Sequence, residues 1–167
     1  MDDPVPLILR PAGPMDAVPM RRLAAAAYEK YVDRIGREPA PVSADYERIA
    51  ESGDAWVAEQ GGRLVGLLVV AAARDHLLIE NVAVAPQAQG LGIGRELLRL
   101  AEEQARAHGL HDVRLYTNEA MTENLEFYPR RGFRETGRAV QDGFHRVFFA
   151  KPVSAEPTPR RDDTAPR

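Results

Sequence analysis

The stretch Gln89-Gly90-Leu91-Gly92-Ile93-Gly94-Arg95 decides the fold of this chain. The apolar segment His76 to Val84 precedes it and is predicted to be a strand. The segment Gly92 to Ala107 follows it and has the clearest helical pattern in the sequence. Its small and apolar residues fall on one helical face: Gly94, Leu97, Leu98, Ala101 and Ala105. The sequence therefore predicts a strand, a glycine-rich turn and a helix in direct succession.

This turn has the features of a phosphate-binding segment. Glycines let the backbone approach a ligand closely, and the start of a helix presents unpaired N–H groups with a partial positive charge. The segment has neither the lysine nor the hydroxyl that a P-loop requires, and Arg95 or Leu97 stands where a dinucleotide fingerprint needs its third glycine. What remains is Gln-x-x-Gly-x-Gly. A strand–helix connection without a ligand is the alternative.

Working outward, the sequence predicts alternating strands and helices. We expect helices at Met15 to Tyr31, Ser43 (as N-cap) to Glu51, and Thr122 (as N-cap) to Arg130. We expect further strands at Val5 to Arg10, Ala55 to Glu59, Leu64 to Ala73, Val113 to Thr117, Phe133 to Thr136 and Phe144 to Ala150, with turns at Gly61-Gly62 and Asp142-Gly143. Asp33 to Pro41 is expected to be a loop. This order predicts an α/β (α+β) fold, with a mixed, mostly antiparallel twisted sheet of about six or seven strands flanked by about four helices.

Composition limits the classes of function. The 167 residues contain no cysteine, which excludes disulfides, thiolate metal sites and a cysteine nucleophile. The net charge of −3 leaves no general basic surface for nucleic acid, and no apolar run is long enough to span a membrane. We expect one domain, 1–152, a disordered tail, 153–167, and a cytoplasmic location, because the acidic N-terminus is unlike a signal peptide. His108 and His111 flank a helix end, so we expect no metal site there.

The glycine-rich turn resembles the acetyl-CoA motif of the GNAT superfamily of N-acetyltransferases. Ile79 to Pro86 resembles the central strand of that family, and Ile8 to Tyr28 fits its first strand and helix. Asn124 to Phe133 resembles a second motif, Asn-x3-Tyr-x3-Gly-Phe. The resemblance covers roughly residues 7–152, and the order and spacing of the motifs together make it specific.

The resemblance implies a GNAT-like fold, acetyl-CoA as co-substrate, and a site for it. Backbone groups of Val82 and Val84 would pair with the pantetheine arm, and Asn124 would hydrogen-bond to it. Tyr128 would direct its hydroxyl at the thioester sulfur. One departure is Pro129, which removes a backbone donor from that helix and kinks it. The donor-binding set as a whole is Val82, Ala83, Val84, Gln89, Gly90, Leu91, Gly92, Ile93, Gly94, Arg95, Asn124 and Tyr128.

Amine acetylation requires a base and an acid. An amine with a pKa near ~10.4 is mostly protonated at neutral pH and must lose a proton before it attacks. Glu80 is a carboxylate in an apolar strand, where burial would raise its pKa and make it a base, directly or through water. A solvent-facing or arginine-paired Glu80 is the alternative. Tyr128 is the candidate acid for the thiolate, and a packing tyrosine is its alternative. Without cysteine, we expect direct transfer in a ternary complex.

The acceptor and its site are the least defined by sequence. Tyr28, Tyr31, Arg34, Arg37 and Asn118 lie in regions that wall the acceptor in similar proteins. Arginines there would clamp a carboxylate on the acceptor, whereas Asp33, Glu38 or Glu119 would attract a polyamine or aminoglycoside. A solvated charged loop is the third alternative. We expect a small amine or amino acid, with a protein N-terminus or lysine left open. A non-catalytic acyl-CoA-binding module is the competing function. Similar proteins are often homodimers, although no segment here argues for that state.

Overall fold

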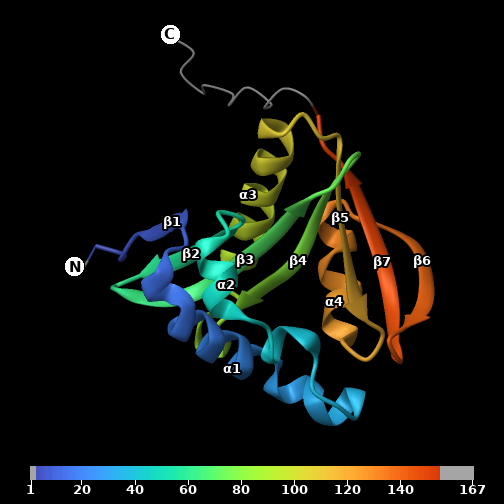
Figure 1. The fold of residues 1–167 in the computed structure, drawn as a ribbon, viewed down its shortest axis with the longest axis horizontal. Coiled ribbons are helices and arrows are strands. Elements are labelled where there is room, and N and C mark those ends of the chain that lie inside the picture. The colour runs from blue at the N-terminus through green and yellow to red at the C-terminus, as the bar shows by residue number, and fades with distance from the viewer. Residues whose placement is uncertain (1–2, 155–167) are drawn as a thin grey trace, which may run out of the picture.

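The computed structural model describes residues 3–154, which form one sheet with helices on both faces (Figure 1). The seven strands are β1 (Leu7–Pro11), β2 (Ala55–Gln60), β3 (Arg63–Ala72), β4 (Leu77–Val84), β5 (Asp112–Asn118), β6 (Arg134–Gln141) and β7 (Phe144–Pro152). The four α-helices in this range are α1 (Ala17–Ile35), α2 (Tyr46–Glu51), α3 (Ile93–Ala107) and α4 (Thr122–Phe127). The predicted fold class is therefore confirmed.

The sheet has the order β1-β2-β3-β4-β5-β7-β6, and β4 and β5 form its parallel pair. This pair is short, because β4 and β5 are in register only from Leu77 opposite Val113 to Ile79 opposite Leu115. Beyond Ile79 the two strands diverge into a fork (Figure 1). Helices α1 and α2 cover one face of the sheet, and α3 and α4 cover the other (Figure 1).

Helix α3 forms where its pattern predicts and is held by its apolar face. Leu97, Ala101 and Ala105 are fully buried against β3 and β4. Helix α1 is longer than predicted, because Asp33 to Ile35 continue it up to Gly36, which adopts the left-handed conformation that ends a helix. The expected loop therefore starts at residue 36 rather than 33.

Two predicted N-caps are wrong. Helix α2 is capped by Asp45, whose carboxylate accepts the Arg48 N–H at 3.1 Å, and not by Ser43. Helix α4 begins after Met121, without a side-chain cap, so Thr122 lies inside the helix. The α-helix ends at Phe127, and a 3₁₀ turn, Pro129–Arg131, completes the predicted segment.

The C-terminal hairpin is longer than predicted. β6 runs eight residues from Arg134 because it pairs with β7 over its whole length, and its residues are all exposed at the edge of the sheet. Val153, the first residue of the predicted tail, is buried and donates its N–H to the His111 carbonyl at 2.7 Å, so the domain extends past residue 152. The rest of that prediction, 155–167, lies outside the described residues. None of the helices within 3–154 is long and apolar enough to cross a bilayer.

A partly buried ion pair between Arg10 and Asp16 fixes the start of α1. Asp16 is 6% exposed, and its carboxylate accepts bonds from the Arg10 guanidinium at 2.8 and 2.9 Å and from the Gly13 N–H at 2.8 Å. The bond from Arg10 lowers the pKa of Asp16 below its ordinary value. The charged form is therefore the stabilising one, and its contribution is lost as pH falls through that lowered pKa.

We accordingly expect Asp16→Asn to lower the free energy of unfolding at pH 7 by about 1–3 kcal/mol. The difference from the wild type should shrink as pH falls below the unfolded-state pKa of about 3.9. Urea unfolding of both proteins at pH 7 and pH 3 measures it, and a difference that stays constant between these two pH values would contradict the assignment.

Candidate functional site

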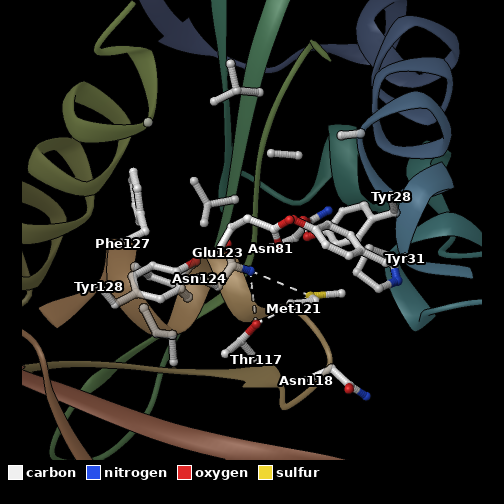
Figure 2. Close-up of a pocket in the computed structure, with 18 of the residues that line it drawn as sticks. Tyr28, Tyr31, Asn81, Thr117, Asn118, Met121, Glu123, Asn124, Phe127 and Tyr128 are labelled. Carbon is white, nitrogen blue, oxygen red and sulfur yellow. Dashed lines mark hydrogen bonds between the residues drawn. The ribbon is translucent and has the colours of Figure 1, made fainter. Parts of the chain in front are cut away.

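The fork between β4 and β5 opens into the main cavity of the described residues, with a volume of about 750 Å³. Its walls come from α1, β4, the glycine-rich turn, β5 and α4. Figure 2 shows Phe127 and Tyr128 on one side and Tyr28 and Tyr31 on the other, with Thr117, Met121 and Asn124 between them. We call the first side the donor half and the second the acceptor half.

The predicted donor-binding residues all line this one cavity. The backbone of β4 pairs with β3 but leaves β5 after Ile79, so its other edge faces the cavity. The first α-helical bond of α3 runs from the Glu96 N–H to the Gly92 carbonyl, so the amides of residues 93–95 precede it and have no partner in the helix. The structure thus brings together Val82, Ala83, Val84, Gln89, Gly90, Leu91, Gly92, Ile93, Gly94, Arg95, Asn124 and Tyr128.

Two glycines of the turn are required by its geometry. Gly92 has φ of +84°, a left-handed conformation that other residues adopt at a cost. Gly94 allows the Phe127 ring to pack closely against the backbone of α3, because a Cβ there would meet that ring at 3.1 Å. The turn is therefore shaped both by its backbone and by its packing against the residue that precedes Tyr128.

Arginines make the donor half electropositive. The Cζ of Arg131 lies over the Phe127 ring, 3.6 Å from its centre, and Nη1 donates to the Phe127 carbonyl at 2.9 Å. Its Nε is buried without a hydrogen-bond partner. Burial and the charges of Arg95 and Arg130 lower the pKa of the Arg131 guanidinium from its ordinary value. Within residues 3–154 no carboxylate pairs with Arg95 or Arg131. Sequence reasoning did not identify Arg131, because its position matters only once α4 packs beside α3.

Tyr128 is buried at 6% exposure among Phe127, Phe133 and Phe149, with ring centres 5.3–5.7 Å away. This burial raises the pKa of its hydroxyl well above the ordinary value, so the phenol stays protonated at neutral pH. The hydroxyl makes no hydrogen bond to any described residue, although the ring lines the cavity. Pro129 does not displace it, because the Tyr128 N–H still donates to the Asn124 carbonyl at 3.2 Å and the 3₁₀ turn begins only afterwards.

Glu80 lines the cavity at the closed end of the fork, where β4 contains a bulge. Val69 is opposite Asn81 and Val70 is opposite Ile79, so Glu80 has no partner on β3. Its side chain is exposed, and no described arginine or lysine pairs with it. The expectation that Glu80 is buried is therefore wrong, because the fork exposes this strand to the cavity. Its role as base stays a prediction.

Asn124, in the first turn of α4, is held by a small polar cluster. Its side-chain amide donates to the Thr117 hydroxyl at 3.0 Å, and that hydroxyl contacts the Met121 sulfur at 3.4 Å (Figure 2). Thr117 is itself buried at 6% exposure. The amide is thereby fixed to β5, which leaves the side-chain oxygen of Asn124 available as an acceptor toward the cavity.

The acceptor half contains a second buried network, which the sequence did not predict. Asn81, at 8% exposure, accepts a bond from the Tyr28 hydroxyl at 2.7 Å and donates to the Tyr46 hydroxyl at 3.2 Å. Tyr46 in turn donates to the Pro41 carbonyl at 2.5 Å, and burial raises the pKa of its hydroxyl to about 12. The network ties α1, α2 and β4 into one rigid wall. An asparagine within an apolar strand was the signal that could have indicated it.

Of the five predicted acceptor residues, the structure brings Tyr28, Tyr31 and Asn118 to the cavity. Arg34 and Arg37 are not among its walls. Arg34 pairs with Glu123 at 2.8 Å, which lowers the pKa of that carboxyl to about 2. Arg37 donates to the Asp142 carbonyl and lies over the Phe144 ring at 3.3 Å. Both arginines fasten the end of α1 and its loop to neighbouring elements, and their role toward an acceptor stays a prediction.

His108 and His111, which the sequence places beside a helix end, directly follow α3 (Ile93–Ala107). Within residues 3–154, His, Asp and Glu side chains nowhere gather in a group of three that could hold a metal ion. The Nδ1–H of His108 donates to the Gln104 carbonyl at 2.8 Å, at the end of α3.

Known proteins share this sequence pattern and fold. Residues 19–133 match the model of the acetyltransferase (GNAT) family. N-acetyltransferase 8 of Mus musculus is 30% identical over 127 residues, covering 72% of this chain and 56% of the relative. N-acetyltransferase 8F1 of Rattus norvegicus is 29% identical over 135 residues, covering 77% and 60%. The chain therefore spans little more than half the length of these curated relatives.

Solved structures agree in fold. The PaiA N-acetyltransferase of Thermoplasma acidophilum, in complex with coenzyme A, has a TM-score of 0.74 at 18% identity, covering 89% of this chain and 99% of that one. The IAA acetyltransferase of Bacillus cereus has a TM-score of 0.63 at 24% identity, covering 89% and 100%. The match of the family model over more than half of the sequence carries the assignment, and this chain belongs to the acetyltransferase (GNAT) family.

Proposed function

We propose that the protein is an acetyl-CoA-dependent N-acetyltransferase that acts on the primary amine of a small molecule or amino acid. One observation carries this proposal. A single cavity joins the unpaired edge of β4 and the free amides at the start of α3 to the side chains of Glu80 and Tyr128. Donor-binding groups and two groups that can transfer protons thus face the same space.

The donor half suits a molecule with several phosphates. The amides of Ile93, Gly94 and Arg95 offer hydrogen bonds to a pyrophosphate at the positive end of α3. Arg95 and Arg131 add two cations without carboxylate partners among the described residues, and an anion would satisfy the buried Nε of Arg131. The free edge of β4 fits the amides of a pantetheine arm. The fold neighbour from Thermoplasma acidophilum binds coenzyme A, which supports this donor.

The proposed reaction is a direct transfer. The amine gives a proton to Glu80, directly or through a water molecule, and its nitrogen forms a bond to the thioester carbonyl carbon. The carbon–sulfur bond then breaks, and the thiolate takes the proton of the Tyr128 hydroxyl. The nitrogen loses its second proton as it becomes an amide, and this proton restores the Tyr128 phenol, while Glu80 releases its proton to solvent. Each assisted proton transfer contributes about 10²–10⁴-fold, and the alignment of amine and thioester contributes more. A covalent acetyl-enzyme is not part of this scheme, because the chain has no cysteine.

Release of coenzyme A from acetyl-CoA tests the proposal, with L-phenylalanine, phenethylamine, spermidine and a short peptide as acceptors. We expect turnover with at least one small amine. If the protein binds acetyl-CoA but releases no coenzyme A with any of them, the catalytic proposal fails and the non-catalytic binding module becomes the better reading.

The role of Glu80 is tested by Glu80→Gln. We expect kcat/KM for the amine to fall by about 10²-fold at neutral pH, because the amine loses its proton acceptor. The loss should narrow as pH approaches the pKa of the amine, about 10, where the substrate is deprotonated in solution. Glu103→Gln, an exposed change on α3, is the matched control. An unaltered rate for Glu80→Gln at pH 7 would remove Glu80 as the base.

A further inference from the structure

Some of the charged side chains on the cavity wall have ion-pair partners, and others have none. Two carboxylates reach this wall, Glu80 and Glu123, and Arg34 neutralises Glu123 at 2.8 Å. The cations Lys30 and Arg146 also line the cavity, and neither forms an ion pair with a described carboxylate. A free carboxylate and a free guanidinium therefore line the same cavity.

Arg146 is held in place without being neutralised. Its Nη1 donates to the Gln141 side-chain oxygen at 2.8 Å, and its Cζ lies 4.2 Å from the centre of the Tyr116 ring. The Phe144 ring lies on a further side at 5.8 Å. These contacts fix the plane of the guanidinium, but only one of its five N–H donors is used by them. The remaining donors have the forked geometry that binds a carboxylate in two places.

Through Tyr116, the sheet connects this cation with the strand that carries Glu80. Ile79 on β4 and Leu115 on β5 form the last pair before the fork, so Glu80 and Tyr116 are the first residues of its two arms. Glu80 and Tyr116 both line the cavity, and Arg146, which also lines it, is stacked on Tyr116. The arrangement offers a carboxylate on β4, one arm of the fork, and a guanidinium on β7 that is stacked on the other arm, β5.

We propose that the acceptor is an α-amino acid with an apolar side chain, whose carboxylate is bound by Arg146 while its amine faces Glu80. This inference rests on the proposed acetyl transfer. Aromatic and apolar residues complete the pocket for the side chain, among them Tyr31, Met121 and Phe144. Arg146 is thus a specificity residue of the acceptor half, distinct from Arg34 and Arg37, which are occupied by other contacts.

The same charges disfavour a polyamine or an aminoglycoside. Such an acceptor would need several free carboxylates, and the described wall offers Glu80 alone, because Glu123 is paired. Glu119, a candidate from the sequence, pairs with Arg138 at 3.0 Å. Asp33 and Glu38 do not line the cavity.

A matched pair of acceptors tests the inference. L-Phenylalanine and phenethylamine differ by the carboxylate, and we expect the wild type to prefer L-phenylalanine at least about 10-fold in kcat/KM. Arg146→Gln should lower kcat/KM for L-phenylalanine by about 10- to 100-fold, mainly through KM, and leave phenethylamine within about twofold. Arg146→Lys keeps the charge but loses the forked guanidinium, so its kcat/KM for L-phenylalanine should lie between those of the wild type and Arg146→Gln. Arg138→Gln, on the neighbouring strand β6, is the control, and it should leave kcat/KM for both acceptors unchanged.

Several results would overturn the inference. Equal use of the two acceptors by the wild type would do so, and so would an equal loss for both acceptors in Arg146→Gln, since that pattern indicates a structural role. A preference that disappears in Lys30→Gln but survives in Arg146→Gln would assign the carboxylate to Lys30 instead. Unchanged thermal unfolding and acetyl-CoA affinity in Arg146→Gln exclude misfolding as the cause.

The experiment separates this inference from the proposed function. If coenzyme A is released equally with amines that carry a carboxylate and amines that lack one, acetyl transfer is supported. The same result refutes the role of Arg146 in binding the acceptor. If no acceptor causes release, calorimetric binding of L-phenylalanine to the protein saturated with coenzyme A still decides the matter. Binding that weakens in Arg146→Gln supports the carboxylate site, and absent or unaltered binding refutes it.

Discussion

Tyr128→Phe should lower kcat by about 10²-fold or more while the affinity for acetyl-CoA stays the same. The substitution removes one oxygen atom, which we assign as the proton donor to the leaving thiolate. The phenol suits this role because burial raises its pKa and keeps it protonated across neutral pH. The ring remains in the variant and keeps its contacts with Phe127, Phe133 and Phe149.

The Tyr128→Phe substitution should leave the packing and hydrogen bonds of the fold unchanged. The Tyr128 hydroxyl makes no hydrogen bond to the described residues, so its removal leaves no buried group without a partner. We therefore expect the thermal unfolding midpoint to change little. Steady-state kinetics gives kcat, and calorimetry with acetyl-CoA in the absence of an acceptor gives the affinity. A variant that turns over at the wild-type rate would mean that Tyr128 is a packing residue and that water or another group protonates the thiolate.

Gly94→Val should weaken acetyl-CoA binding by about 10²-fold or more. A single Cβ at this position already meets the Phe127 ring at 3.1 Å and approaches the Val84 side chain at 3.8 Å. The two further methyl groups of valine must displace Phe127 or project into the donor half. Either movement disturbs the amides at the start of α3 and the ring on which Arg131 lies. The substitution should lower the affinity for acetyl-CoA more than the free energy of unfolding, because Gly94 lies at the cavity wall.

Gly137→Val is the matched control for this experiment. Gly137 lies on the exposed edge strand β6, and a Cβ there would have no neighbour within 4 Å. Isothermal calorimetry with acetyl-CoA compares the two variants with the wild type. Gly94→Ala should lie between the wild type and Gly94→Val, because one methyl needs only a small shift of Phe127. Wild-type affinity in Gly94→Val would show that the donor does not use the start of α3.

The donor half could be predicted because its main parts are local in sequence. Residues 82–95 form the edge strand, the turn and the helix start in one continuous stretch, and local geometry presents their backbone groups to the same space. Tyr128 lies far along the chain, and its assignment came from the resemblance of Asn124 to Phe133 to a family motif. The structure brings it to the same cavity because α4 packs beside the start of α3, where Gly94 admits the Phe127 ring.

The acceptor half could not be predicted in the same way. Glu80 was expected to be buried because its neighbours in sequence are apolar, but burial depends on the strand alongside, and β5 leaves β4 at that point. Asn81 was not singled out, since its partners Tyr28 and Tyr46 come from two separate helices. Arg34 and Arg37 have the right charge, yet Arg34 pairs with Glu123, Arg37 donates to the Asp142 carbonyl, and neither arginine lines the cavity.

The sequence by itself determined the strand–turn–helix unit, indicated the family by resemblance, and singled out a set of residues that the structure gathers at one cavity; their binding of the donor stays a prediction. These features follow from backbone conformation and from side-chain periodicity, which act between near neighbours in the chain. Only the tertiary structure decided where the sheet splits, which carboxylates and arginines neutralise each other, and which remain free at the cavity. Those outcomes depend on pairing between distant segments, because a charge is available to a ligand only when no other part of the fold has already satisfied it.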